Sequence, residues 1–159
     1  MISEILCAAV MSMGLPRAHV ACNYMDLITE ESKKNDLDPA LVIALIRAES
    51  RFKVDAVSRA NACGLMQVLP KYTKNPKLSC EQLKDPSTNI TTGTKKLKFW
   101  IYKYGRGNIS TGLCGYNAGF RCKGKNKNAT GVRYAKKVLL YKRKIKRKYN
   151  KIFKGLKSL

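Results

Sequence analysis

The sequence predicts a mainly α-helical domain with at most a very short β element, and three observations support this prediction. Apolar residues recur at helical spacing in several segments. Two Asp-Pro pairs, at 38–39 and 85–86, precede such segments, and aspartate and proline are favoured at the start of a helix. No segment is rich in strand-forming residues, so a sheet is not expected.

Residues 1–21 are open to two interpretations. The stretch from Ile5 to Leu15 is apolar, has the length of a signal-peptide core and ends near Pro16. The residues before it include Glu4 and no Lys or Arg, which is unlike a typical signal peptide. We therefore expect either the signal peptide of an exported protein or a buried N-terminal helix.

Two helices are expected next, over residues 23–35 and 40–52. The second follows Asp38, a good N-cap residue. It is apolar at every position from Leu41 to Ile46. A helix that is apolar nearly all round belongs in a core. We therefore expect the second helix to be the central one.

The middle of the chain is predicted to hold loops and two further helices. Residues 53–64 are expected to form a loop, and residues 66–68 a short strand or an extended turn. A helix follows Asp85-Pro86 and ends near Gly105, after which another helix begins. Residues 120–131 are rich in Gly, Lys and Asn and are predicted to form an exposed loop.

The last segment carries one apolar stripe at helical spacing, and Lys and Arg fill most of the other positions. The stripe consists of Val138, Tyr141, Ile145, Tyr149, Ile152 and Leu156. We expect residues 22–140 to form the domain and residues 141–159 to form a basic amphipathic C-terminal extension.

Positive charge is concentrated in the second half of the chain. Residues 1–85 hold 11 Lys/Arg and all 10 Asp/Glu, whereas residues 86–159 hold 21 Lys/Arg and no acid. This half is expected to meet a polyanion, such as nucleic acid, anionic lipid, lipopolysaccharide, teichoic acid or the carboxylate-bearing cell wall. The apolar fraction of 45% excludes a disordered chain, and no apolar run is long enough to span a membrane.

The six cysteines permit disulfides without requiring them. No two have C-x-x-C spacing and His19 is the only histidine, so a zinc site is not expected. In an exported protein, Cys114 with Cys122 would close a short loop and Cys63 with Cys80 a longer one. Reduced, buried thiols are the alternative.

Glu49 is the first candidate for chemistry. It lies near the end of the apolar helix, where loss of hydration would raise its pKa and favour the protonated form near neutral pH. A neutral carboxylic acid beside a cleft can protonate the leaving oxygen of a glycosidic bond, and Ser50 would orient it. From this helix alone, a glutamate that turns to solvent or pairs with Arg47 or Arg51 is the simpler interpretation.

Four further segments give Glu49 a context. In chain order, the five segments are Ile46-Arg47-Ala48-Glu49-Ser50-Arg51-Phe52, Ser58 with Cys63-Gly64-Leu65-Met66-Gln67-Val68-Leu69-Pro70, Asp85-Pro86 with Asn89-Ile90 and Gly93, Gly115-Tyr116-Asn117-Ala118-Gly119, and Thr130 with Tyr134 and Val138. Together, in this order and spacing, they resemble the soluble lytic transglycosylases, whose catalytic domain is similar to goose-type lysozyme. The resemblance extends over residues 24–140 and implies a lysozyme-like helical fold.

The resemblance implies an enzyme, a peptidoglycan lytic transglycosylase with Glu49 as its single acid and base. It would cut the β-1,4 bond between N-acetylmuramic acid and N-acetylglucosamine, and the muramic C6 hydroxyl would close a 1,6-anhydro ring. Most glycosidases use two carboxylates. Here neither Asp55 nor Asp85 stands in a family position for a nucleophile, so substrate groups would replace the second one. No metal or cofactor is implied.

The resemblance also implies six substrate-binding residues, which are Ser50, Met66, Gln67, Tyr116, Asn117 and Tyr134. The amide and phenol groups would hydrogen-bond the sugars, the methionine would form an apolar wall of the cleft, and Tyr134 would set the pKa of Glu49. The alternative for the methionine and the two tyrosines is core packing, and for the two amides it is backbone capping.

Two other functions stay open at this stage. A hydrolytic lysozyme of the phage endolysin type would use the same fold, and a non-catalytic protein would bind polyanions through the basic half. The expected partner of a monomeric enzyme is the peptidoglycan glycan strand. Residues 136–157 would contact anionic membrane or lipopolysaccharide, with nucleic acid as the alternative. The expected location is the periplasm or cell envelope, or a phage particle.

Overall fold

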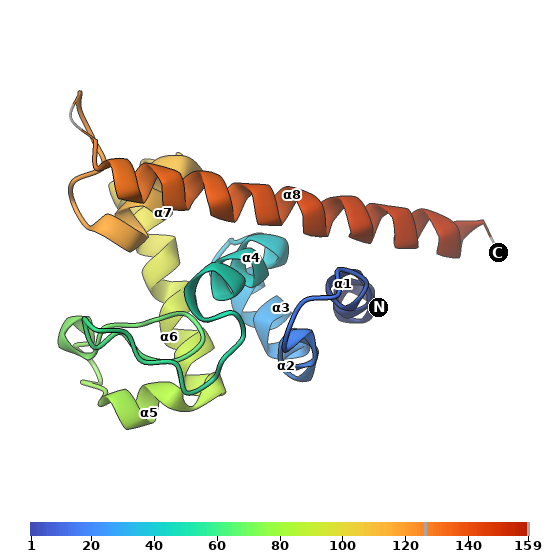
Figure 1. The fold of residues 1–159 in the computed structure, drawn as a ribbon, viewed down its shortest axis with the longest axis horizontal. Coiled ribbons are helices and arrows are strands. Elements are labelled where there is room, and N and C mark those ends of the chain that lie inside the picture. Colours follow the sequence, from blue (N-terminus) through green and yellow to red (C-terminus); the bar gives the residue numbers. More distant parts are fainter. Residues whose placement is uncertain (126, 159) are drawn as a thin grey trace.

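The computed structural model describes residues 1–125 and 127–158, and within them helices account for every regular element (Figure 1). The α-helices are α1 (Ile2–Met11), α2 (Ala18–Asn23), α3 (Met25–Lys34), α4 (Pro39–Ser50), α5 (Cys80–Lys84), α6 (Pro86–Lys98), α7 (Ile109–Ala118) and α8 (Ala129–Lys157). A 3₁₀ turn, η1 (Pro70–Tyr72), and a π-helical turn, η2 (Phe99–Tyr104), complete the set. Two isolated bridges, Val57 with Cys63 and Cys63 with Val68, supply the β pairing. The mainly α prediction is confirmed.

Helix α4 lies at the centre of the molecule (Figure 1). The Asp38 carboxylate accepts a hydrogen bond from the Ala40 amide at 2.9 Å and so caps its start. The side chains from Leu41 to Ile46 are at most 1% exposed. The prediction of a central buried helix is therefore confirmed, and its last turn emerges from the core at Arg47.

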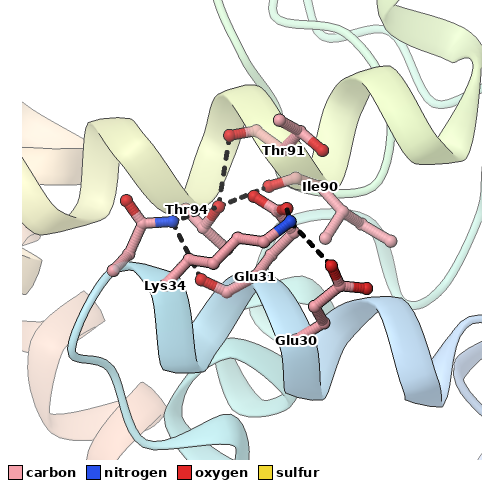
Figure 2. Close-up of polar contacts among 7 residues, drawn as sticks. Glu30, Glu31, Lys34, Ile90, Thr91 and Thr94 are labelled. Atoms are coloured by element: carbon pink, nitrogen blue, oxygen red, sulfur yellow. Dashed lines mark hydrogen bonds and ion pairs between the residues drawn. The ribbon is translucent and has the colours of Figure 1, made fainter.

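Helices α3 and α6 pack against each other through a polar network (Figure 2). The Lys34 ammonium pairs with Glu30 and with the buried Glu31 at 2.7 and 3.0 Å. From the end of α3, the Asn35 amide donates to Thr94 on α6, whose hydroxyl donates to the backbone of its own helix. Because buried polar groups need partners, this network holds α3 in one register against α6.

Helix α8 is 29 residues long and lies across α7, α4 and α1 before it extends beyond them (Figure 1). Its start at Ala129 falls inside the range predicted as a loop, because the Asn128 side chain caps the helix by accepting from the Gly131 amide. The predicted stripe packs inward at Ile145, which is 1% exposed, but not at Leu156, which is 54% exposed. Residue 126 of the predicted loop and residue 159 of the predicted extension lie outside the described residues.

Residues 1–21 contribute α1 and most of α2. Helix α1 buries Ile5 and Leu6 and packs on α8, and a disulfide joins its Cys7 to Cys22. Within the described ranges, none of the helices combines the length and apolarity needed to cross a membrane.

All six cysteines form disulfides. Of the two alternatives left open by the sequence, disulfides are present and reduced thiols are not, and they include the pairs Cys63–Cys80 and Cys114–Cys122. The Cys7–Cys22 bond was not predicted, because the first of these cysteines lies in the segment that had two interpretations.

Candidate active site

Glu49 occupies the last turn of α4 and meets α8. Its carboxylate accepts a hydrogen bond from the Tyr134 hydroxyl, with 2.5 Å between the two oxygens. Loss of hydration raises the pKa of Glu49 to about 7, although the Tyr134 hydrogen bond and the positive charge of Lys137 act to lower it. The group can therefore hold a proton or release it near neutral pH, as a general acid and base must.

The chain turns sharply after Glu49. Arg51 and Phe52 have φ angles of 52° and 63°, in the left-handed region that side-chain-bearing residues rarely adopt. Phe52 is 1% exposed, so its packing in the core stabilises this turn. The turn ends α4 at Ser50 and keeps Glu49 at the edge of the core rather than within a longer helix.

A tight turn at residues 63–68 carries Met66 and Gln67, two of the residues implied for the site. Gly64 has a φ of 76°, and a Cβ atom there would lie 2.2 Å from the Leu83 carbonyl oxygen, so only glycine fits. The fully buried Asn89 holds the turn from α6. Its Oδ1 accepts from the Met66 amide at 2.7 Å, and its Nδ2 donates to the Cys63 and Leu83 carbonyls at 2.8 and 2.6 Å.

Tyr116 connects the turn at Met66 to the surroundings of Glu49. Met66 is fully buried against Gly93 of α6, where a Cβ atom would lie 2.5 Å from its sulfur. The Tyr116 hydroxyl donates to the Met66 carbonyl at 2.8 Å. Burial and the negative charge of Glu49 raise the pKa of Tyr116 well above its usual value, which places this phenol within electrostatic reach of the carboxylate.

Three other residues implied by the resemblance have different surroundings. The buried Ser50 hydroxyl donates to the Ile46 carbonyl of its own helix. The Gln67 amide nitrogen donates to the carbonyls of Ala56 and Gly64 at 3.0 Å each, as expected of an amide that caps backbone. Asn117 is exposed on α7. Of the seven residues implied for the site, Tyr134 bonds directly to Glu49, whereas Tyr116 lies within reach of its charge and holds the Met66 carbonyl.

Two residues that sequence reasoning did not assign to the site support it. Asn89 anchors the 63–68 turn, and the signal for it was an amide next to the apolar Ile90 and at helical spacing from the apolar Leu97 of α6. Lys137 acts on the charge of Glu49, but nothing distinguishes it in sequence from the other lysines of α8. Within the described part of the chain, no three His, Cys, Asp or Glu side chains are grouped to hold a metal ion.

Relatives of this chain share the arrangement of helices. A 92-residue stretch is 34% identical to the "Membrane-bound lytic murein transglycosylase C" of Mannheimia succiniciproducens, over 52% of this chain and 25% of the relative. The lytic transglycosylase Slt of Pseudomonas aeruginosa superposes with a TM-score of 0.71 and 27% identity, covering 86% of this chain and 25% of that one. The 70 kDa soluble lytic transglycosylase of Escherichia coli gives 0.68 at 24% identity, over 82% and 26%, and so shares the fold.

The chain spans about a quarter of the length of each of these relatives. The two solved structures confirm the predicted lysozyme-like helical fold of the soluble lytic transglycosylases. The family model described as "Transglycosylase SLT domain" matches residues 26–139, which is more than half of the chain. The chain therefore belongs to the Transglycosylase SLT domain family.

Proposed function

We propose that this domain is a peptidoglycan lytic transglycosylase that cuts the β-1,4 bond between N-acetylmuramic acid and N-acetylglucosamine. The observation that carries the proposal is the Glu49 carboxyl, whose pKa of about 7 lets it both donate and accept a proton near neutral pH. The Pseudomonas aeruginosa relative, an inactive mutant with glutamine in place of a glutamate, supports an essential acid of this type.

Glu49 acts twice in the proposed reaction. It first gives its proton to the glycosidic oxygen as the bond to the muramic C1 breaks, while the muramic N-acetyl group stabilises the positive centre. The carboxylate then takes the proton of the muramic C6 hydroxyl as that oxygen bonds to C1. The products are a 1,6-anhydromuramic end and a free N-acetylglucosamine 4-hydroxyl, and no water is consumed.

The surroundings of the other acids favour this single-carboxylate mechanism. Asp55 lies 3.9 Å from the Lys53 ammonium on the surface, and Asp85 caps α6 by accepting from the Thr88 amide. The family resemblance places neither of these aspartates in the site. A glycosidase that works with two carboxylates needs the second one across the scissile bond. The substrate's own groups therefore replace it.

Mass spectrometry of the products tests the proposal. Purified cell walls treated with the protein are expected to release anhydromuropeptides, and Glu49→Gln is expected to release none. Glu30→Gln is the matched control, because Glu30 is an exposed glutamate on α3. Reducing-end products, heavier by one water, would instead identify a hydrolytic lysozyme, and binding of walls without any cleavage would indicate a non-catalytic polyanion-binding protein.

We also propose that residues 136–157 hold the enzyme at an anionic membrane or lipopolysaccharide surface in the cell envelope. This segment carries 11 Lys/Arg and no acid. Leu140 is 42% exposed among these cations, as suits a helix at a lipid interface. The word "membrane-bound" in the name of the Mannheimia relative supports an envelope location.

Sedimentation with lipid vesicles tests this contact. The protein is expected to pellet with phosphatidylglycerol vesicles and not with phosphatidylcholine vesicles. Replacement of the exposed Arg143, Arg147, Lys151 and Lys154 by glutamine, which leaves the buried Ile145 in place, is expected to abolish pelleting. Retention on DNA at physiological salt without vesicle binding would make nucleic acid the partner.

A further inference from the structure

Aromatic rings gather on the surface where η2 meets the end of α7. The Phe120 ring, directly after α7, lies 5.0 Å from the Trp100 ring and 5.5 Å from the Tyr104 ring, centre to centre. Trp100 also meets Phe99 edge to face at 5.3 Å. Phe120 is nevertheless 72% exposed, and Phe99 is 39% exposed. Because a contiguous exposed apolar patch forgoes the stabilisation that burial gives, this cluster indicates a binding surface.

Phe120 and Trp100, which we call the aromatic platform, are held in place by their neighbours. Cys122 stands two residues after Phe120, and its disulfide to Cys114 ties the loop to α7. Its amide also donates to the Tyr104 hydroxyl at 3.0 Å. Binding costs little conformational entropy when the contacting side chains are already fixed. The platform therefore suits a ligand of defined shape.

The platform adjoins the candidate active site through α7. The Trp100 ring packs on this helix at Gly115, where a Cβ atom would lie 2.5 Å from the ring. The next residue, Tyr116, lies within reach of the Glu49 charge. Phe120 follows Tyr116 by four residues, about one helical turn. A polymer that passes Glu49 and continues along α7 would reach the platform at the end of that helix.

The platform has a cationic border. The Lys123 ammonium lies 4.4 Å from the centre of the Tyr104 ring, in a cation–π contact. Arg121 and Lys125 are exposed in the same loop. Residues 86–159 contain no Asp or Glu. The charge around the platform therefore favours a partner that carries acidic groups.

We propose that the platform binds a sugar of the peptidoglycan glycan strand at a distance from the bond that is cut. The inference rests on the proposed function, since the glycan strand is the polymer that would lie at Glu49. An aromatic ring presents a flat, rigid apolar face, on which the C–H face of a sugar stacks, and the cations nearby suit the carboxylates of the cell wall. A strand held at two places binds more tightly than one held at Glu49 alone.

The fluorescence of Trp100, the single tryptophan of the chain, tests this contact directly. The probe is soluble glycan strands from which an amidase has removed the peptides, added to the Glu49→Gln variant so that no cleavage interferes. The emission of Trp100 is expected to change on binding. In the same background, Phe120→Ala is expected to weaken the binding about tenfold, as loss of one aromatic anchor implies.

A matched control and a second variant accompany this measurement. Tyr72→Ala is the control, because Tyr72 is a 60% exposed aromatic residue of η1 that also has a lysine over its ring but lies outside the platform. Phe120→Leu keeps an apolar side chain beside Trp100 but lacks the flat ring, so it is expected to weaken binding as Phe120→Ala does. With Glu49 intact, Phe120→Ala should raise KM on long strands about tenfold and leave kcat unchanged, whereas a structural effect on Glu49 would lower kcat.

The possible outcomes separate this proposal from its alternatives. Unchanged Trp100 emission at saturating glycan, or equal losses from Phe120→Ala and Tyr72→Ala, overturns it. A response to single-stranded DNA or to phosphatidylglycerol vesicles without a response to glycan also overturns it, because the partner would then be nucleic acid or membrane. If glycan strands change the emission and Phe120→Ala weakens their binding, but wild type cleaves no walls, the platform is supported and the proposed function fails.

Discussion

The Tyr134 hydroxyl lies 2.5 Å from Oε1 of Glu49 and joins two residues 85 positions apart in the chain. The bond connects the first turns of α8 to the last turn of α4, so the start of the long C-terminal helix belongs to the candidate active site. It also acts against burial, because a hydrogen bond to the ionised carboxylate favours that form. The balance of the two effects sets the pH at which Glu49 holds its proton.

The pH dependence of cleavage follows from this balance. Glu49 must be protonated to donate to the leaving oxygen, and its pKa lies at about 7. The value of kcat/KM should therefore fall as the pH rises through about 7. Rates on purified peptidoglycan from pH 5 to 9 check this expectation, and a rate that stays level up to pH 9 would contradict it.

Tyr134→Phe should change both the maximum value of kcat/KM and the pH at which kcat/KM falls. Without the hydrogen bond that favours the carboxylate, the pKa of Glu49 should rise, and the alkaline fall in rate should move to higher pH. The rate at the optimum should drop about tenfold, because the carboxyl loses the contact that orients it. Tyr102→Phe is the control, since Tyr102 donates to Asp36 on the exposed surface. A drop in rate without a shift of the profile would mean that the tyrosine only orients the acid.

Glu49→Gln should stabilise the protein at alkaline pH. The pKa of Glu49 is about 7 in the folded protein, against 4.5 ordinarily, so the folded state binds this proton more tightly than the unfolded state. The stability that the group contributes is complete below about pH 4.5 and is lost as the pH rises through 7. Glutamine has no such charge to bury, so the variant should exceed wild type by about 3 kcal/mol at pH 8 and match it at pH 4. Denaturant unfolding at the two pH values measures this, and equal stabilities at pH 8 would show that the carboxylate is well hydrated.

Local signals made much of the fold predictable. Helices α4 and α6 begin directly after Asp38 and Asp85 because both side chains cap the first turn, and these caps are visible in the sequence. The apolar stripe predicted α8 as a helix. It did not predict that Ile145 would be buried and Leu156 exposed, because that depends on where α1 and α4 lie beneath the helix.

The site was predictable only through the family resemblance. No spacing rule links Glu49 to Tyr134, and the apolar helix alone favoured a surface role for the glutamate. The resemblance alone could not reveal how Gln67 is used. Its side-chain amide donates hydrogen bonds to the backbone carbonyls of Ala56 and Gly64. These contacts depend on the backbone conformation of the turn at Gly64, which has no simple sequence signal.

The disulfides allow a matched test of how the 63–68 turn supports the site. Cys63–Cys80 and Cys7–Cys22 join residues 17 and 15 positions apart, so replacing either pair by serine should cost a similar amount, about 3 kcal/mol. Only the first bond adjoins the turn that carries Met66. At a temperature where both variants are folded, loss of Cys63–Cys80 should therefore lower kcat further than loss of Cys7–Cys22. Equal effects on kcat would mean that Asn89 alone is sufficient to hold the turn.

Alanine substitutions at Gly64 and Gly107 distinguish the cost of backbone strain from the cost of a steric clash. Both have positive φ, 76° and 85°, so alanine at either position adopts a strained conformation that costs about 1 kcal/mol. A Cβ at Gly107 meets nothing within 4 Å, whereas one at Gly64 would lie 2.2 Å from the Leu83 carbonyl oxygen. The Leu83 carbonyl is backbone, so relief of this contact requires the 63–68 turn to move away from Asn89.

Gly107→Ala should therefore lower the stability by about 1 kcal/mol and leave wall cleavage unchanged. Gly64→Ala should cost more than about 3 kcal/mol, because a buried hydrogen-bond network breaks as well. It should also reduce cleavage, since displacement of Met66 removes the carbonyl to which Tyr116 donates. Denaturant unfolding and wall lysis of the two variants measure these effects. Similar losses in both variants would show that the turn at Gly64 can shift without disturbing the residues around Glu49.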